Sequence, residues 1–468
     1  MQGMSDMPLG DLAPELAVLL GAVGVLLLAM LLPQRHHRLC APITILVLAS
    51  ATALALSQAG AERFTFSGTF RLDAATTWGR VMVLGLTALC VAMTPAWMED
   101  DRRHGEFYSM MLLSALGAMA MIGAADLMQM LMGALLSSVT GYVLAAYHRD
   151  WEISLEAGMK YFLLGALANA LMVFGAILVM GLGGSTDYQQ LSNAFPTEPL
   201  ALVGLACVVF GLFFKLGAVP GHAWVPDVAE GAPLPAAAFL TVVPKIAGAI
   251  ALARLVALVP AEAMPLSALV ATVAALTMTW GNLSAMWQED LRRLLGWSSV
   301  SQTGYALMAV AVLGRAPDAW AALIAFMGVY GLANIACFAV VAHLRGRTEL
   351  AGWAGIGRQH PLAVSILALG FLSLVGIPPL AGFLGKFALF KVALDGGMAW
   401  LALLAVANTV LSLFYYLRVL GPAVMGTPEK SAATLGRANL WIGALAAVGV
   451  VLLLPWAWQD LWRALSGG

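Results

Sequence analysis

The chain has 468 residues, of which 61% are hydrophobic and 10% are charged, and its formal net charge is −1. This composition excludes an ordinary soluble globular domain, and the near-zero charge indicates no particular partner. The mean hydropathy is +0.88. Apolar runs of roughly 20 residues, the length that crosses a bilayer as a helix, recur along the chain. We therefore predict an all-α polytopic membrane protein.

About fourteen apolar runs have a length that spans a membrane. The first is followed directly by others, so we interpret it as a helix and not as a cleaved signal. In chain order the predicted spans are 12–32, 39–59, 75–96, 106–123, 126–147, 156–181, 200–220, 233–258, 265–285, 291–313, 318–342, 361–390, 398–425 and 438–458.

Basic residues alternate between the loops that join these spans. One set of loops holds Arg35, Arg38, Arg102, Arg103, Arg149, Arg292, Arg293, Arg345, Arg347, Arg358, Arg418, Lys430 and Arg437. The other set holds only Arg63, Arg71, Arg315 and Arg463. Because loops rich in Lys and Arg stay in the cytoplasm, we predict that the first set is cytoplasmic and that both termini are periplasmic.

Four lysines fall inside predicted spans, at Lys160, Lys215, Lys245 and Lys386. A charge at the bilayer centre costs at least about 2.5–3.5 kcal/mol, so such a lysine is expected to face a partner or a wet cavity. The alternative is that a lysine near a helix end extends to the headgroups. For Lys160, close to the start of its span, the two interpretations have equal weight.

Prolines lie in or beside the spans that carry three of these lysines, at Pro220, Pro244, Pro378 and Pro379. "KLGAVPGH" (Lys215–His222) and "GIPPLAGFLGK" (Gly376–Lys386) each combine a helix-breaking proline with a lysine, in different halves of the chain. Broken helices at membrane depth are tolerated where they line a protein-buried or watered cavity, and in transporters they mark binding sites. The repeated pairing predicts two related units, each with a discontinuous helix.

A lysine removed from water gives up its proton more readily, so a row of buried lysines can relay protons. His222 either continues such a relay from Lys215 or is a capping or surface histidine. Asp227 and Glu230 are expected to be a solvated pair in a short cytoplasmic loop. Further polar residues within spans are expected to hydrogen-bond neighbouring helices; they are Asn169, Asn282, Ser298, Ser299, Ser301, Gln302, Thr303, Tyr305, Asn334 and Asn408.

Several stretches resemble the antiporter-like, proton-translocating membrane subunits of NADH-quinone oxidoreductase (respiratory complex I). They are "GHAWVPDVAEGAPLPAAAFLTVVPKIA" (Gly221–Ala247), "DLRRLLGWSSVSQTGYALMAV" (Asp290–Val310), "GIPPLAGFLGKFALFK" (Gly376–Lys391) and "YFLLGALANALMVFG" (Tyr161–Gly175). The form "WVPDVAEGAP" followed by "PKIA" is most similar to subunit N. The resemblance covers nearly the whole chain.

The resemblance implies fourteen helices, with helices 4–8 and 9–13 forming two inverted repeats. The corresponding segments are 1–105, 106–258, 265–425 and 438–468. It also implies that Lys215, Lys245 and Lys386 are the functional lysines, with Lys160 a further family lysine. Lys386 would be the relay on the periplasmic exit side.

The same resemblance implies a subunit of a proton-translocating NADH:quinone oxidoreductase in the bacterial inner membrane. Expected partners are the neighbouring antiporter-like subunit M, the small membrane subunits and the lipid bilayer, with no nucleic acid. This chain is expected to bind no cofactor or metal and to hold no redox centre. NADH, FMN, iron–sulfur clusters and quinone would be bound by other subunits.

One position departs from the family pattern. In "GALLSSVTGYVLAA" (Gly133–Ala146), Leu135 occupies the place of a family glutamate that pairs with the seventh-helix lysine. Asp126 begins the same helix, but nine residues earlier it lies about 13.5 Å away along the axis, so it is not expected to replace that contact.

Two alternatives remain open at this point. The chain is either a cation/proton antiporter or membrane-hydrogenase subunit of the same superfamily, or a structural subunit whose transport is impaired. Leu135 favours the second alternative. The three retained lysines oppose it, because a scaffold has little physical reason to keep buried amines.

Overall fold

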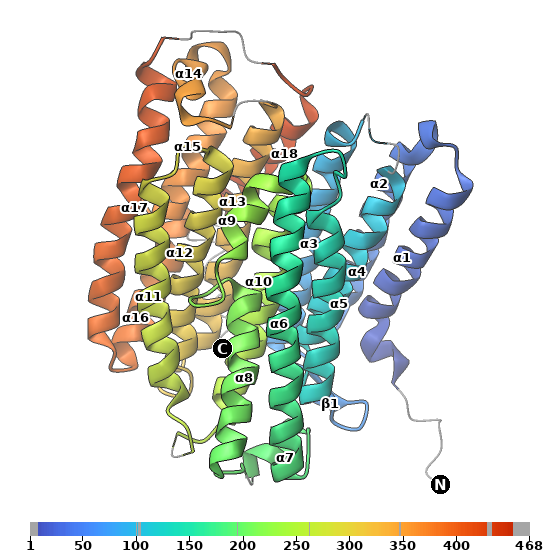
Figure 1. Ribbon diagram of the computed structural model, residues 1–468, viewed down its shortest axis with the longest axis vertical. Helices are drawn as coiled ribbons and strands as arrows, with labels where there is room; N and C mark the ends of the chain where they lie inside the picture. The colour runs from blue at the N-terminus through green and yellow to red at the C-terminus, as the bar shows by residue number, and fades with distance from the viewer. Residues whose placement is uncertain are drawn as a thin grey trace.

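Long helices standing side by side form the molecule. The computed structural model describes residues 8–99, 101, 104–193, 195–261, 263–345, 348–427 and 433–452. The helix axes run roughly along one direction, with the N-terminal helices at one edge and α16 and α17 at the opposite edge (Figure 1). Apolar side chains fill the spaces between neighbouring helices throughout.

The observed helices correspond closely to the predicted spans. Eleven of those described are long and apolar enough to cross a membrane, and α15 and α18 are shorter apolar helices, so the predicted count of fourteen stays a prediction. The main helices are α1 (Ala13–Leu31), α2 (Cys40–Ser57), α3 (Ala74–Trp97), α4 (His104–Ile122), α5 (Leu127–Ala145), α6 (Glu152–Gly183), α8 (Pro199–Leu216), α9 (Trp224–Gly231), α10 (Leu234–Leu258), α11 (Leu266–Met286), α12 (Leu291–Ala311), α13 (Ala319–His343), α15 (Pro361–Val375), α16 (Ala381–Asp395), α17 (Ala399–Met425) and α18 (Ala438–Leu452).

Two spans are discontinuous, as the paired motifs predict. The predicted span 200–220 corresponds to α8, and the separate short helix α9 begins just beyond it; the span 361–390 is α15 followed by α16. The first helix ends at Leu216, not at the predicted residue 220, because Gly217 takes a left-handed conformation with φ of 67°. Gly376 ends α15 in the same way with φ of 90°. Glycine adopts this conformation without steric cost, so each break begins at a glycine and the prolines follow it.

The helices of the two predicted repeats, 106–258 and 265–425, pack against one another in a similar way. α4 lies against α5 and α6 against α8, while α11 lies against α12 and α13 against α15. The assignment of 106–258 and 265–425 as inverted repeats remains a prediction that this pairing favours.

Small elements not predicted from the sequence lie at the ends of the bundle. β1 (Arg63–Thr65) and β2 (Phe70–Leu72) form an antiparallel hairpin, with Phe64 opposite Arg71. This hairpin and the short α7 (Tyr188–Asn193) lie at one end, and α14 (Ile356–Gln359) lies at the other (Figure 1). The remaining short elements are the 3₁₀ helices Leu9–Leu12, Gln34–Leu39 and Leu350–Trp353. Five residues of the two basic-loop sets (Arg102, Arg103, Arg347, Lys430 and Arg463) and residues 453–458 of the last predicted span lie outside the described residues.

The centre of the bundle is α10. This helix is buried along almost its whole length and packs against α3, α4, α8, α12 and α13. Its many alanines allow close approach by several neighbours. Pro244 lies inside α10 without ending it, so this proline, unlike those of the two breaks, does not interrupt its helix.

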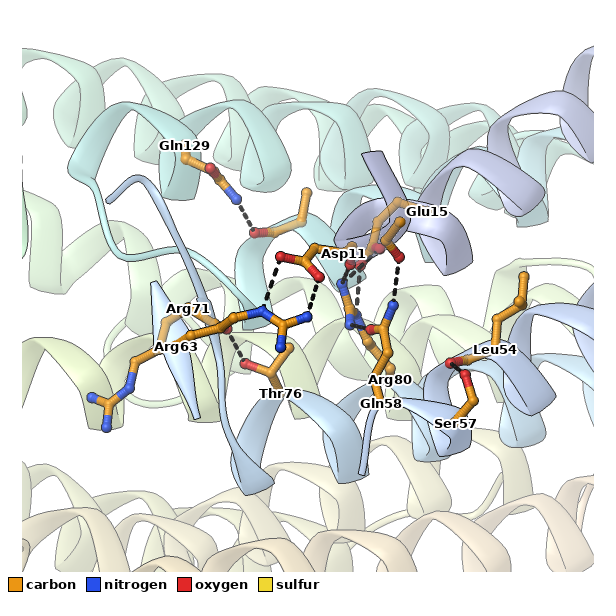
Figure 2. A network of polar contacts seen from close by, with 12 residues as sticks. Asp11, Glu15, Leu54, Ser57, Gln58, Arg63, Arg71, Thr76, Arg80 and Gln129 are labelled. Carbon is orange, nitrogen blue, oxygen red and sulfur yellow. Dashed lines mark hydrogen bonds and ion pairs between the residues drawn. The ribbon is translucent and has the colours of Figure 1, made fainter. Parts of the chain in front are cut away.

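Buried ion pairs tie the first three helices together. Arg80 on α3 is fully buried and donates to both carboxylate oxygens of Glu15 on α1, each at 2.7 Å, and to the Gln58 side-chain oxygen at 2.7 Å. Asp11 accepts from Arg63 next to this pair (Figure 2). Arg80 lies inside the predicted span 75–96, where only lysines were expected as buried charges.

A second cluster joins α3 to the central helix at the end where the hairpin lies. Arg254 on α10 forms two hydrogen bonds of 2.9 Å to the Asp73 carboxylate, which also pairs with Arg71 at 3.0 Å. Burial alone would raise the pKa of Asp73, but the charge and hydrogen bonds of Arg254 outweigh it and hold that pKa below its usual value. The pair fixes α10 against α3 and the hairpin.

The Glu15–Arg80 pair gives a stability prediction. Arg80→Ala leaves the Glu15 carboxylate buried without its partner, which typically costs about 3–5 kcal/mol. We expect a lower thermal midpoint for the purified protein in detergent. Replacing both partners, as in Glu15→Leu with Arg80→Leu, removes the unpaired charge and should recover most of the loss. A double variant as unstable as Arg80→Ala would contradict this account.

Candidate functional site

Lys215 lies in the last turn of α8, where the first discontinuous helix breaks. Its side chain is 2% exposed. The ammonium donates to the Ser138 hydroxyl at 3.0 Å and to the Ala134 carbonyl at 3.4 Å, both on α5. Above it, the Trp224 indole donates to the Phe214 carbonyl at 2.9 Å, which fixes α9 over the end of α8.

The helix α5 presents no acid to Lys215. Among the described residues, no carboxylate oxygen lies within 4.0 Å of its Nζ. Leu135 directly follows Ala134 and lies one turn before Ser138, so a glutamate at this position would be on the same flank of the helix. Asp126 instead caps the start of α5 through the amides of Met128 and Gln129, at 2.7 and 3.2 Å.

Lys245 lies at the middle of the central helix and is fully buried. Its ammonium donates to the Ser299 hydroxyl at 2.7 Å, the Ser299 carbonyl at 3.1 Å and the Thr303 hydroxyl at 3.2 Å. All three acceptors belong to α12. The Ser299 hydroxyl also bonds to the Tyr330 hydroxyl of α13 at 2.7 Å. Three neutral acceptors therefore satisfy the ammonium without an acidic partner.

The first break and Lys245 are neighbours. The Thr303 hydroxyl donates to the Leu216 carbonyl at 3.0 Å, so one threonine contacts both the end of α8 and the central lysine. A methyl group at Gly217 would lie only 3.3 Å from Lys245 Nζ and 2.4 Å from a Val225 methyl. Gly217 thus serves two purposes, since it ends the helix and leaves room for the lysine.

Lys386 lies on α16, just after the second break, and is 2% exposed. Its ammonium donates to the carbonyl of Val375, the last residue of α15, at 3.1 Å. It also lies over the ring of Tyr305 on α12, 3.9 Å from the centroid, which is the geometry of a cation–π contact. Because the helix ends here, the Val375 carbonyl is available to Lys386, whereas in a continuous helix it would accept a backbone hydrogen bond.

One helix, α12, connects the two halves of this site. It carries Ser299 and Thr303 at Lys245 and Tyr305 at Lys386, within two turns. Between them, Gln302 donates to the Leu374 carbonyl at the second break, at 3.0 Å. This polar axis contacts Lys245 and Lys386 directly and reaches the first break, beside Lys215, through the Thr303–Leu216 bond, while the Lys215 ammonium itself bonds to α5.

Lys160 does not belong to this axis. Its side chain is 46% exposed and pairs with Glu156 at 2.7 Å and with Asp227 at 3.2 Å. The expectation of a solvated Asp227–Glu230 pair was wrong, because both residues lie on α9 and each accepts from Arg293 at 2.7 Å. Arg293 and Lys160 therefore hold α9 between α12 and α6. Beside Glu230, a cavity of about 960 Å³ is lined by Glu289, Asp290, Arg292, Glu349 and Arg418, among others.

His222 lies in the loop between α8 and α9. Its ring is 5.6 Å from the Trp297 ring of α12, and its Nδ1 is buried without a hydrogen bond to any described residue. The histidine is thus close to the axis, while no direct bond to Lys215 joins them in the described part of the chain. Its place in a relay stays a prediction.

The lysine partners are the residues that sequence reasoning assigned least well. Ser299, Thr303 and Tyr305 were expected only to bridge helices, and Ser138 was not singled out. Their spacing held a signal: residues 299 and 303 are one turn apart and share a face of α12. Recognising that Lys245 faces them required the tertiary structure.

Comparisons with known proteins agree with this architecture. The family described as NADH:quinone oxidoreductase/Mrp antiporter, TM, matches residues 124–412. The NADH-quinone oxidoreductase subunit N 1 of Streptomyces griseus is 41% identical over 450 residues, covering 95% of this chain and 94% of the relative. A chain of respiratory complex I from Thermus thermophilus superposes with a TM-score of 0.83 at 32% identity, covering 97% of this chain and all of that one. A chain of the Mrp complex from Dietzia has a TM-score of 0.85 over 98% of this chain and 97% of its own, but at 20% identity it shows the fold alone. This chain therefore belongs to the NADH:quinone oxidoreductase/Mrp antiporter membrane family, among the proteins named NADH-quinone oxidoreductase subunit N.

Proposed function

We propose that this chain is the proton-translocating subunit N of a bacterial NADH-quinone oxidoreductase. The observation that carries the proposal is the set of three buried lysines, two at helix breaks and one at the bundle centre, of which Lys245 and Lys386 contact α12 directly and Lys215 lies beside the Leu216 carbonyl that accepts from Thr303 of α12. Buried ammonium groups are costly, and neutral hydroxyls and carbonyls let them exist both with and without the extra proton. That property suits a relay better than a scaffold.

The protein works within a larger membrane complex. Its relatives are named as subunits of NADH-quinone oxidoreductase, and solved structures of similar chains come from multi-subunit membrane complexes. We infer that subunit M and the small membrane subunits are its neighbours in the inner membrane. NADH oxidation and quinone reduction, with their FMN and iron–sulfur clusters, take place in partner subunits, and this chain supplies proton movement alone.

The proposed direction of transfer follows the charge distribution. The cavity beside Glu230 lies at the end of the bundle predicted to be cytoplasmic, next to α9 and the first break. Protons enter from this side, reach Lys215 and Lys245, and pass along α12 to Lys386. They leave toward the end predicted to be periplasmic.

Two other functions are compatible with the fold: that of an antiporter or hydrogenase subunit, and that of a purely structural subunit. An antiporter or hydrogenase subunit shares the fold, but the names of the relatives at 34–41% identity favour NADH-quinone oxidoreductase. A purely structural subunit would tolerate loss of its buried lysines once assembled. The next two experiments separate that possibility from proton transfer.

Lys245→Ala tests the central lysine. We expect the complex to assemble while the protons moved per NADH fall, because Ser299 and Thr303 lose the group that carries the proton. The measurement is proton uptake by vesicles containing the complex, together with NADH oxidation. Lys391→Ala, which removes an exposed lysine outside the axis, is the matched control. Wild-type pumping by an assembled Lys245→Ala complex would remove this residue from the path.

Replacing Lys386 by arginine tests whether this lysine carries a proton or only supplies a fixed positive charge. Lys386→Arg retains the positive charge, but a guanidinium with a pKa above about 12 does not release its proton in practice. We therefore expect arginine to be as damaging to proton transfer as alanine. Full turnover of the Lys386→Arg complex would show that the lysine is only a counter-charge held between Val375 and Tyr305.

A further inference from the structure

Two cavities that none of the three axial lysines lines lie next to each other along α3 and α13. The first, of about 370 Å³, is at the end of the bundle predicted to be periplasmic, where the hairpin and α7 lie (Figure 1). The second, of about 400 Å³, lies between α3 and α13 and is lined only by apolar residues. Both volumes are within the range of sites that bind small molecules.

The two cavities follow one continuous line along the helices. On α3, Ala74 and Ala75 line the first cavity, and residues from Trp78 to Leu89 line the second. On α13, Ile324 lines both. Ala75, Trp78 and Ile324 also belong to one small packed cluster. The polar cavity at the end of the bundle therefore lies directly beside the apolar groove.

The apolar groove has the length of one bilayer leaflet. From Trp78 to Leu89 it extends about 16 Å along α3, at about 1.5 Å per residue. The hydrocarbon core of a bilayer is about 30 Å thick, so each leaflet contributes about 15 Å. Gly85 lies within this stretch and is exposed, and a methyl group there would meet no described atom within 4 Å. The missing side chain leaves a groove that fits a hydrocarbon chain.

The polar cavity presents one charge of each sign to a ligand. Asp73 is occupied, because it accepts two hydrogen bonds of 2.9 Å from Arg254 and pairs with Arg71 Nε at 3.0 Å. The two Nη atoms of Arg71 have no acceptor among the described residues, and its side chain is 48% exposed. Glu62 is exposed and makes no ion pair within the described part of the chain. A guanidinium and a carboxylate thus line the same cavity.

We propose that the two cavities form one binding site for a phospholipid with a zwitterionic, primary-amine headgroup, whose acyl chain lies in the groove between α3 and α13. The phosphate accepts from Arg71 and the ammonium donates to Glu62, each through a charge-assisted hydrogen bond. Trp78 and Trp320 lie where the polar and apolar parts meet, and tryptophan is enriched at this level of a membrane. The inference goes beyond the proposed proton transfer and does not depend on it.

The two charges decide between this lipid and other occupants. An anionic headgroup would leave Glu62 without a partner and would place a like charge near it. A quaternary amine has no N–H group to donate to a carboxylate. A helix of a neighbouring subunit would cover the apolar groove, but it gives no role to Arg71 and Glu62 at the end of that groove. A zwitterionic phospholipid with a primary amine accounts for both parts of the site.

Photo-crosslinking in the purified, complete complex tests the site. The probe is phosphatidylethanolamine with a diazirine in its acyl chain, added in limiting amount to the complex in detergent, and mass spectrometry locates the label. We expect labels within residues 78–89 and 324–332. Gly85→Phe fills the groove and should abolish this label. Gly24→Phe on α1 is the matched control, because Gly24 is also exposed with no described atom near an added methyl group, and it should keep the label.

Competition by unlabelled lipids tests the headgroup. Phosphatidylethanolamine should displace the probe more effectively than phosphatidylcholine or phosphatidylglycerol. Glu62→Gln removes the carboxylate charge and should reduce this preference by up to about fivefold, which is the scale of one exposed ion pair. Equal competition by the three lipids in the wild type would overturn the assignment of the headgroup.

Two further results would contradict the site itself. If the complex is labelled elsewhere but not within 78–89 or 324–332, another part of the complex covers the groove. If the label survives Gly85→Phe, the lipid lies outside the groove. Should Gly85→Phe prevent assembly, Gly85→Leu narrows the groove with a smaller side chain and is measured in the same way. These readouts involve no proton movement, so their failure would leave the proposed function standing.

Discussion

The rest of the structure depends on one constraint: lysine ammonium groups that lie away from both water and acidic side chains must still find hydrogen-bond acceptors. Each of the three axial lysines is almost completely buried, and each is satisfied by neutral oxygens. An unsatisfied ammonium in such a place would be too costly to keep. The protein must therefore bring hydroxyls and unused carbonyls to the bundle centre, where helices normally keep their own carbonyls occupied.

The two breaks meet this requirement with similar means. At each, a left-handed glycine ends a helix and leaves carbonyls that a continuous helix would consume. The Leu216 carbonyl then accepts from Thr303, and the Val375 carbonyl accepts from Lys386. Because α12 lies against both breaks, its polar residues serve both halves. The Arg254–Asp73 pair and the Arg293 cluster hold α10 and α9 in place, so the ion pairs at the ends of the bundle position the uncharged contacts at its middle.

Much of this architecture is readable from the sequence, because spans depend on local hydrophobicity. The run 233–258 became α10 almost residue for residue, and both lysine–proline motifs mark real breaks. The end of α8 was misplaced because a left-handed glycine, not Pro220, stops the helix. Asp227 and Glu230 were misread since their partners lie 63 to 67 residues away along the chain.

The contacts of the lysines depend on tertiary packing and were not predictable in this way. Serine in a membrane helix can bond within its own helix or to a neighbouring one, so the sequence does not show that Ser138 and Ser299 face a lysine. Glu15 and Arg80 are 65 residues apart, and nothing local to either predicts that they meet. Leu135 shows the converse: its departure from the family pattern is visible in the sequence, but the contacts that Lys215 makes instead, to Ser138 and Ala134, are visible only in the packing of α8 against α5.

We propose that Lys215, Lys245 and Lys386 act as one proton path, with α12 in contact with Lys245, with Lys386 and with the Leu216 carbonyl beside Lys215. The most direct test keeps every lysine and removes only the hydroxyl groups of α12 that contact Lys245, with Ser299→Ala and Thr303→Val combined in the reconstituted complex. The quantity measured is protons moved per NADH oxidised. Our account predicts a clear fall in that ratio with normal assembly, because Lys245 loses both of its hydroxyl contacts and the Leu216 carbonyl at the first break loses its donor. An unchanged ratio would contradict the account, since protons would then cross without the contacts that define the axis.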